Sequence, residues 1–196
     1  MCCRYYIDED TLAEALAEVP GAEAPEPFPF RGDIHPADAA PVLLRQQNHL
    51  RTEICRWGWE TDFGFVINAR SETAAQKHLF RTSLMLRRCA VPVRAFYEWD
   101  REKMRYTFTR PGKQPFFLAG FFDRPLGGED PPRFVVLTRS PDAVVEKIHN
   151  RMPVLLDGAA AARWTEDTQR TPAFRSESIL PLQAQPDIEQ LRLDLD

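Results

Sequence analysis

The amino terminus carries two adjacent cysteines, in Met1-Cys2-Cys3-Arg4. Removal of Met1 would leave the Cys2 thiol two carbons from a free α-amine, whose pKa of roughly 7.7 to 8.0 leaves part of it neutral at pH 7. Such an aminothiol can form a Schiff base with an aldehyde and then close a five-membered thiazolidine ring. It can also act as an N-terminal nucleophile in amide cleavage, with its own amine as the base. The alternative is that a cysteine at position 2 is incidental.

Two candidates for proton transfer lie far apart in the sequence. Glu98 stands in Phe96-Tyr97-Glu98-Trp99, where apolar surroundings would raise its pKa and suit it to proton transfer near neutrality. The alternative is a strand-face carboxylate that points to water. His149 follows a stretch with a helical pattern, and imidazole carries protons at neutral pH. Its alternative role is to bind the last carbonyl groups of that helix.

Asn68 and Arg70 end a segment that is otherwise apolar. An amide and a guanidinium at a strand end can orient a substrate and pair with a phosphate. The alternative is a turn-forming Asn beside a solvated Arg. Trp57, Trp59 and Trp99 could stack on unpaired bases, although tryptophans are more often core residues.

The other cysteines and histidines do not indicate a metal site. No Cys-x-x-Cys pair or His/Cys cluster has the spacing of zinc ligands, and the adjacent Cys2 and Cys3 point in different directions, so we expect no metal and no cofactor. Cys55 and Cys89 have apolar neighbours, as small core residues do. We expect structural or surface roles for His35, His49 and His78.

Short strand patterns outnumber helical ones along the chain. Strands are predicted at 63–68, 89–93, 95–99, 105–110, 116–122, 133–138, 152–156 and 179–182, and helices at 8–19, from 71, from 141 to 148 and at 159–164. Gly112 lies between two of these strands, which predicts an antiparallel hairpin of 105–110 with 116–122. We therefore expect an α+β fold with a mainly antiparallel, barrel-like β-sheet and peripheral helices, in a single domain over residues 1–196.

Composition and charge exclude several classes of protein. Of the 196 residues, 43% are hydrophobic, and the apolar run 116–122 is far shorter than the ~20 residues of a membrane span. No apolar signal-peptide core follows Met1, so we expect a soluble, cytoplasmic protein with reduced thiols. The net charge is −4, yet residues 45–110 carry 13 Lys/Arg against 7 Asp/Glu. A basic middle between acidic ends suits an anionic ligand.

Four ordered blocks together resemble the SOS response-associated peptidase family, whose members are also called abasic-site processing proteins. The blocks are Met1-Cys2-Cys3-Arg4, Asn68-Ala69-Arg70-Ser71-Glu72-Thr73, Phe96-Tyr97-Glu98-Trp99 and His149-Asn150-Arg151-Met152-Pro153. The resemblance spans nearly the whole chain. It implies a DNA-damage response protein that binds single-stranded DNA with an abasic site. Cys2, after loss of Met1, would form a covalent thiazolidine crosslink that shields the lesion.

The resemblance also implies a role for each matching residue. Cys2 would form the crosslink, and Asn68 would orient the Cys2 amine or the opened sugar. Glu98 would transfer protons between that amine and the sugar, and His149 would assist ring opening as an acid. The DNA-binding residues would be Arg4, Arg70 and Thr138 on phosphates and Trp99 stacked against bases. We expect a monomer that is associated with the nucleoid when bound to DNA, with possible chemistry as a lyase and in reversing its own crosslink.

Three features differ from the family pattern. Cys3 stands where most members have Gly, and it could crowd the nucleophile or supply a second thiol. Gly32-Asp33-Ile34-His35-Pro36 replaces an Asn-x-Ala-Pro type of segment. The region between Trp57 and Asn68 is short, so we expect a reduced DNA-separating element.

Two other functions stay open at this point. Cys2, Glu98 and His149 could serve a cysteine-dependent peptidase, including one limited to its own N-terminal residues. A non-catalytic module could instead recognise single strands with Arg70 and the tryptophans.

Overall fold

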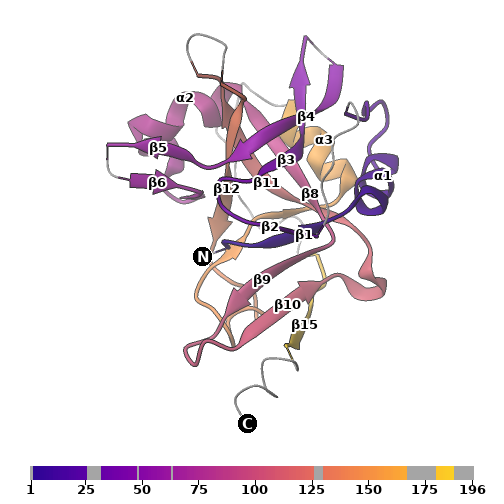
Figure 1. Ribbon diagram of the computed structural model, residues 1–196, viewed down its shortest axis with the longest axis vertical. Helices are drawn as coiled ribbons and strands as arrows, with labels where there is room; N and C mark the ends of the chain where they lie inside the picture. Colours follow the sequence, from indigo (N-terminus) through magenta and orange to yellow (C-terminus); the bar gives the residue numbers. More distant parts are fainter. Residues whose placement is uncertain are drawn as a thin grey trace.

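The computed structural model describes residues 2–25, 32–47, 49–62, 64–125, 130–166 and 180–187. Within these residues strands dominate, and three α-helices lie at the periphery, which confirms the predicted α+β class. Figure 1 shows a larger group of strands flanked by the helices and a smaller group beneath it. The helices are α1 (Glu9–Ala17), α2 (His78–Leu86) and α3 (Gly158–Glu166).

The larger sheet contains a closed circuit of strand pairings. The circuit runs β12–β4–β3–β8–β11 and returns to β12, and the pairs are antiparallel except for β12 with β4. This closure confirms the predicted barrel-like, mainly antiparallel arrangement. Its strands are β3 (Ala39–Gln46), β4 (His49–Trp57), β8 (Arg88–Val93), β11 (Phe116–Asp123) and β12 (Arg133–Arg139). The short strands β7 (Asn68–Arg70), β13 (Met152–Pro153) and β14 (Leu155–Leu156) extend it.

Both faces of β11 and β12 are buried, which explains the apolar runs 116–122 and 134–137 within them. Alternate residues of β11 enter two different hydrophobic clusters, with Phe116 and Leu118 in one and Phe117 and Phe121 in the other. The first cluster also receives side chains from the smaller sheet, and the second receives them from the helices. Packing therefore fixes β12, and with it the strand β7 that pairs alongside.

The smaller sheet is antiparallel, with the strand order β15–β10–β9–β1–β2. The central strands β1 and β9 each have a partner on both sides, so neither is an edge. These strands are β1 (Tyr5–Ile7), β2 (Gly32–Ile34), β9 (Ala95–Trp99), β10 (Arg105–Thr109) and β15 (Gln183–Pro186). The register places the amino-terminal residues beside the end of β9.

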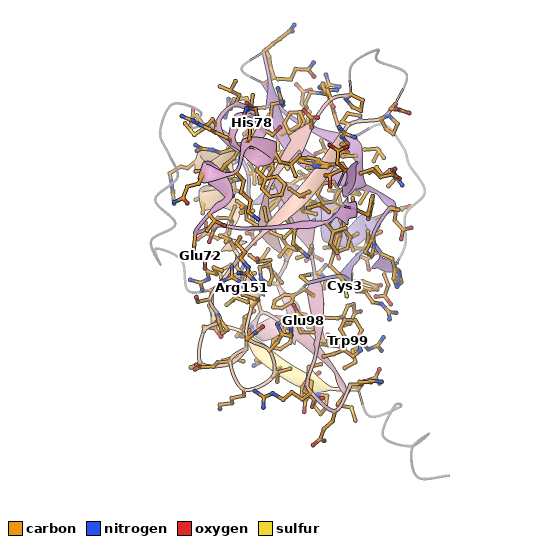
Figure 2. The ribbon with its side chains drawn as sticks, turned by 90° about the vertical axis from the view of Figure 1, so that its left-hand side faces the viewer. Cys3, Glu72, His78, Glu98, Trp99 and Arg151 are labelled. Carbon is orange, nitrogen blue, oxygen red and sulfur yellow. The ribbon has the colours of Figure 1, made fainter. Side chains whose placement is uncertain are left out.

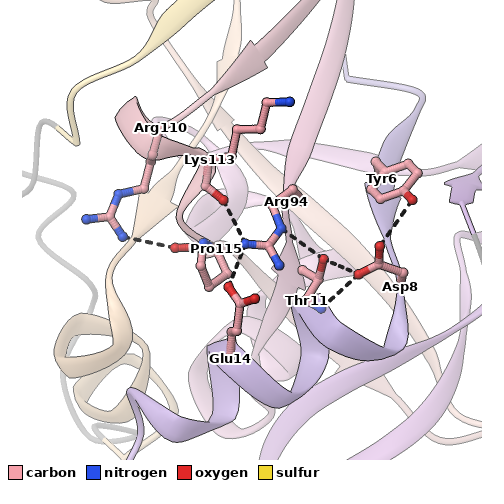
Figure 3. Close-up of polar contacts among 8 residues, drawn as sticks. All are labelled: Tyr6, Asp8, Thr11, Glu14, Arg94, Arg110, Lys113 and Pro115. Atoms are coloured by element: carbon pink, nitrogen blue, oxygen red, sulfur yellow. Dashed lines mark hydrogen bonds and ion pairs between the residues drawn. The ribbon is translucent and has the colours of Figure 1, made fainter.

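Helix α1 begins where the sequence predicts a helix. Asp8 is its N-cap and accepts a hydrogen bond from the Thr11 backbone N–H at 2.8 Å. Arg94, between β8 and β9, donates to the Thr11 hydroxyl at 3.1 Å and to Glu14 at 2.7 Å (Figure 3). It also donates to the Lys113 carbonyl at 2.7 Å. These contacts fix α1 against the junction of the two sheets.

The remaining described elements are short. The hairpin of β5 (Trp59–Thr61) and β6 (Gly64–Val66) forms a separate two-stranded sheet. Short 3₁₀ helices lie at Ala74–Gln76 and Pro111–Lys113. The predicted strand 63–68 is thus two strands, β6 and β7, which separate at Ile67, and Phe63 lies outside the described residues. Residues 71–73 form a turn, and α2 starts only at His78.

Three predicted elements are wrong. Strands β10 and β11 do not form a hairpin, because β10 pairs with β9 and β15 while β11 pairs with β8, β12 and β14. Residues 143–148 form hydrogen-bonded turns instead of a helix, with His149 N–H donating to the Val145 carbonyl at 2.8 Å. Residues 180–182 are not a strand, since β15 begins at Gln183, and Ile179 lies outside the described residues.

The first hydrophobic cluster contains residues of both sheets, as a single domain would. The boundaries 1–196 stay a prediction. Among the described residues, no helix is long and apolar enough to cross a membrane.

Candidate active site and nucleic-acid interface

The amino-terminal residues lie beside Glu98 because of the pairing between β1 and β9. Tyr5 is opposite Phe96, and the Tyr97 N–H donates to the Arg4 carbonyl at 3.0 Å. Continuing this antiparallel register brings Cys3 next to Glu98. Figure 2 shows Cys3, Glu98 and Trp99 in the same region of the molecule. Residues about 95 positions apart in the sequence are thus neighbours.

Asn68 ties the second residue of the chain to the larger sheet. Its Nδ2 donates to the Cys2 carbonyl at 2.7 Å, while its Oδ1 is buried without a hydrogen-bond partner among the described residues. The preceding residue is fixed as well, because Trp57 Nε1 donates to the Ile67 carbonyl at 3.1 Å. Gly58 has a φ of 91°, and a Cβ there would lie 2.7 Å from the Phe65 ring, so glycine is required after Trp57.

The Cys2 thiol is enclosed. Cys2 is 0% exposed, and its Sγ lies 3.7 Å from the Arg4 carbonyl. Burial and then the nearby Glu98 carboxylate raise the pKa of the Cys2 thiol far above its usual range. Cys3 is only half-buried, and the same two causes raise the pKa of its thiol. Both sulfurs are therefore protonated thiols at neutral pH, so a reaction at Cys2 needs a base nearby.

Glu98 has the properties of that base. It is 2% exposed, and burial raises its pKa from 4.5 to about 7, with the positive charge of the chain's amino terminus acting in the opposite direction. Its Oε2 lies 3.8 Å from His149 Nε2. Burial also lowers the pKa of His149. A carboxyl with a raised pKa next to an imidazole with a lowered pKa can exchange protons near pH 7.

His149 is oriented by the residue two positions further on. The backbone N–H of Arg151 donates to His149 Nδ1 at 3.1 Å, and the Arg151 carbonyl lies 3.0 Å from the same nitrogen. The Arg151 guanidinium forms a bidentate pair with Glu72 at 2.7 and 2.8 Å. This pair lowers the pKa of Glu72 to about 2. Figure 2 shows Glu72 and Arg151 together beside the region of Glu98.

Thr138 is a buried residue that contacts β7 and Arg151. The residue is 0% exposed, its hydroxyl donates to the Ala69 carbonyl at 3.4 Å, and Arg151 donates to the Thr138 carbonyl at 2.7 Å. The Thr138 hydroxyl is thus not exposed in this structure, and its contact with a phosphate stays a prediction. Thr138 helps to hold Arg151, whose side chain in turn meets Glu72.

The two predicted phosphate-binding arginines differ in their surroundings. Arg70 is exposed at the end of β7, where it is opposite Thr138 of β12. Arg4 forms an ion pair with Asp33 of β2, and its guanidinium lies 5.3 Å from the centre of the Tyr97 ring. Both arginines flank the residues that contact Cys2, so they can bind an anion that extends from that point.

Trp99 lies beside His149 at the edge of a hollow of about 660 Å³. The hollow is large enough for a nucleobase, and the partly exposed indole is available for stacking. Trp57 and Trp59 are not available, because they are 0% and 3% exposed core residues. The lining consists of Trp99, Asp100, Arg101, Glu102, Glu146, Lys147, Ile148, His149 and Asn150.

Asp33, Glu72 and Arg151 belong to this site but were not predicted as parts of it from the sequence. Their charges indicate that they could form ion pairs, but the partners are distant in the sequence. Asp33 and Arg4 are 29 residues apart, and Glu72 and Arg151 are 79 residues apart. No group of three or more His, Cys, Asp or Glu side chains in the described ranges is arranged to hold a metal ion.

Residues 1–193 match the family described as SOS response associated peptidase (SRAP), and the chain belongs to this family. The chain is 29% identical over 172 residues to the abasic site processing protein YoqW of Bacillus subtilis, covering 78% of this chain and 77% of that protein. It is 30% identical over 176 residues to the abasic site processing protein YedK of Escherichia coli, covering 84% and 79%. A crystal structure of a protein from Bacteroides thetaiotaomicron has the same fold, with a TM-score of 0.78, 18% identity and coverage of 97% and 94%. The resemblance inferred from the four blocks is confirmed.

Proposed function

We propose that this protein processes abasic sites in DNA as part of a DNA-damage response, by forming a covalent crosslink through Cys2. The relatives named above are abasic site processing proteins. The observation that carries the proposal is the meeting of Cys2 with Asn68 and with the Glu98–His149 pair. Removal of Met1, which lies outside the described residues, would free the α-amine of Cys2.

The crosslink forms in two steps. The neutral Cys2 amine attacks the C1′ aldehyde of the ring-opened abasic sugar, and the resulting carbinolamine loses water to give a Schiff base. Cys2 Sγ then adds to C1′, the thiol proton is transferred to the imine nitrogen, and a thiazolidine closes. Since the thiol is protonated at neutral pH, the second step depends on a base that accepts its proton. The Schiff base also permits β-elimination, which would be a lyase activity.

Glu98 and His149 supply the proton transfers. With a pKa of about 7, Glu98 accepts a proton from the Cys2 ammonium and returns it to the departing hydroxyl. His149 donates a proton during opening of the sugar ring. Asn68 holds the Cys2 carbonyl, and its buried Oδ1 is available to accept a hydrogen bond from the Cys2 amine. The same groups would run the reaction backwards when the crosslink is reversed.

The DNA is bound as a single strand by a monomer. Arg4 and Arg70 neutralise phosphates on either side of Cys2, and Trp99 stacks on a base in the hollow beside His149. This binding depends little on sequence, because phosphate contacts carry no sequence information and the lesion has no base.

The test is to incubate the purified protein with a single-stranded oligonucleotide that has one abasic site. We expect an adduct that survives denaturing electrophoresis, that is absent from Cys2→Ala and that persists in Cys3→Ala. Intact-mass measurement of the purified protein should show loss of Met1. Salt-sensitive binding without any covalent species contradicts the proposal in favour of a binding module, and cleavage of unrelated peptides without an adduct favours a peptidase.

Arg70→Ala tests the interface separately from the chemistry. One lost phosphate contact should weaken binding to all sequences and reduce the slope of log affinity against log salt by about 0.7 to 1. Fluorescence anisotropy with a lesion-free oligonucleotide measures both quantities. An unchanged slope would place Arg70 outside the interface.

A further inference from the structure

The ion pair between Arg4 and Asp33 occupies one of the two guanidinium groups that the proposed function assigns to phosphates. Asp33 is on β2, where the register puts it opposite Tyr6, and its side chain reaches along the strand to Arg4. Both side chains are 25% exposed, so a ligand can approach the pair from solvent. Asp33 is bound through the Nη2 nitrogen of Arg4, so a DNA phosphate that binds the same nitrogen has to replace the carboxylate there.

Tyr97 holds both partners of this pair in place. Its ring centre lies 5.3 Å from the Arg4 guanidinium, and burial followed by a hydrogen bond to Asp33 raises the pKa of Tyr97. The guanidinium is thus fixed over an aromatic ring even when its anionic partner changes. The Asp33 carboxylate therefore occupies the position in which another anion could pair with the oriented Arg4 guanidinium.

A second ion pair beside the same ring provides a comparison. Arg105 lies 5.2 Å from the Tyr97 ring centre and pairs with Asp187. The side chains of this pair are 26% and 18% exposed, close to the values for Arg4 and Asp33. The two pairs differ in position, because only Arg4 is adjacent in sequence to the cysteines that contact the proposed lesion site.

We propose that Asp33 is an internal competitor for the DNA backbone: it holds Arg4 in the orientation of a phosphate-bound arginine and is displaced when a phosphate binds. Asp33 thereby sets the affinity of this protein for single-stranded DNA. The inference rests on the proposed function and deepens it by naming a residue that tunes DNA binding.

Competition of this kind changes the affinity for the strand more than it changes the salt dependence of binding. A phosphate that binds a free arginine releases a condensed cation, and each such contact contributes about −0.7 to the slope for a single strand. These cations are condensed on the DNA strand, so the same number is released whether or not Asp33 has to leave Arg4 first. Removal of the Asp33 charge should therefore raise the affinity and leave the slope close to the wild-type value.

The experiment compares Asp33→Asn with wild type for binding of a labelled, lesion-free single-stranded oligonucleotide at several salt concentrations. We expect affinity about threefold to fivefold higher at low salt, as for loss of one competing surface ion pair, with a slope close to that of wild type. Asp33→Glu, which keeps the charge, should bind like wild type. Asp33→Ser is measured in parallel with a thermal-unfolding scan of each variant, so that the result does not depend on one substitution folding.

Two controls separate competition from a general change of charge. Asp187→Asn removes the same charge beside the same ring and should change affinity by less than about twofold, without changing the slope. In an Arg4→Ala background, Asp33→Asn should give no further gain, because the guanidinium that it competes for is missing.

The inference is overturned if Asp33→Asn and Asp33→Ser bind no tighter than Asp187→Asn, or if the gain persists without Arg4. The proposed function stays intact if wild type forms the abasic-site adduct and the Asp33 variants do not bind the strand more tightly. A wild-type protein that neither binds the strand nor forms the adduct would instead remove the proposed function itself.

Discussion

A polar cluster lies next to each end of the three-residue strand β1, and the two clusters shift the pKa values of their ionisable groups in opposite ways. Beyond its carboxyl end, Asp8, Thr11, Glu14 and Arg94 satisfy one another through hydrogen bonds (Figure 3). Before its amino end, Cys2 and Glu98 are enclosed, and burial is the largest cause of their pKa shifts. The same strand thus anchors a structural network and a reactive site.

The pKa shifts distinguish the two clusters. Burial acts to raise the pKa of Asp8, but the hydrogen bonds from Thr11 and Tyr6 and the charge of Arg94 together outweigh it and lower the pKa. The hydrogen bond from Arg94 lowers the pKa of Glu14. Partners thus stabilise the charged forms at this end, whereas burial stabilises the neutral forms of Cys2 and Glu98. The pKa of about 7 makes the neutral and charged forms of Glu98 similar in free energy near neutral pH, which suits this residue to proton transfer.

The largest predicted effect is that of Glu98→Gln on the rate of adduct formation. Loss of a general base should slow the reaction by about 10²- to 10⁴-fold at pH 8. The wild-type rate should fall as the pH drops through about 7, because Glu98 then becomes protonated, so the difference between the two proteins narrows in acid. Single-turnover kinetics over pH 5–9 measure this. Equal losses of rate and DNA affinity would contradict a proton-transfer role.

Glu98 should also make the stability depend on pH. Its pKa in the folded protein is about 7, above the ordinary 4.5, so the native state binds this proton more tightly than the unfolded chain does. The resulting stability is fully present below about pH 4.5 and is lost as the pH rises through 7. Wild type should lose about 2 to 3 kcal/mol relative to Glu98→Gln between pH 4.5 and 8. Urea unfolding at several pH values tests this, and a constant difference would refute it.

Arg94→Met should disrupt the polar cluster beyond the carboxyl end of β1 without changing the rate of adduct formation. It removes two hydrogen bonds that join α1 to Arg94 and a third from Arg94 to the Lys113 carbonyl, and we expect the free energy of unfolding to fall by about 2 kcal/mol. The rate of adduct formation, measured well below the unfolding temperature, should stay within a factor of two. A large loss of rate in the folded variant would show that the two ends of β1 are coupled.

The smallest effect concerns the pair between Glu72 and Arg151. Glu72→Gln weakens the bidentate contact that fixes Arg151 and, through its backbone, His149. We expect adduct formation to slow by roughly threefold to tenfold through misplacement of the imidazole. Because the pKa of Glu72 is about 2, the loss should be constant from pH 5 to 9.

Glu14→Gln is the matched control for this change. Glu14 also pairs an exposed carboxylate with a mostly buried arginine, with side-chain exposures of 55% and 18% against 46% and 14% for Glu72 and Arg151. It should leave the rate unchanged. Similar losses in both variants would mean that Glu72 acts through general stability and not through His149.

The strands with strong local patterns were predicted from the sequence alone. Residues 116–122 are apolar throughout, and 133–138 contains the apolar run 134–137; they form β11 and β12 with both faces buried. The strands β3 and β4 were not predicted, since Pro41 and the charged residues of β4 weaken the pattern. The predicted pairing of β10 with β11 was wrong, because a short loop containing Gly112 does not determine whether β10 pairs with β9 or with β11.

The sequence by itself determined the family, through the order of four residue blocks, and the α+β class, through its strand and helix patterns. It also identified Cys2, Asn68, Glu98 and His149 as candidates, since residue types and their spacing are written in the chain. Only the tertiary structure decided that Thr138 is buried, that Trp57 and Trp59 are core residues and that Arg4 meets Asp33. Exposure and ion pairing depend on which distant segments pack together. No local pattern records such contacts, because they form between strands that the closed sheet brings side by side.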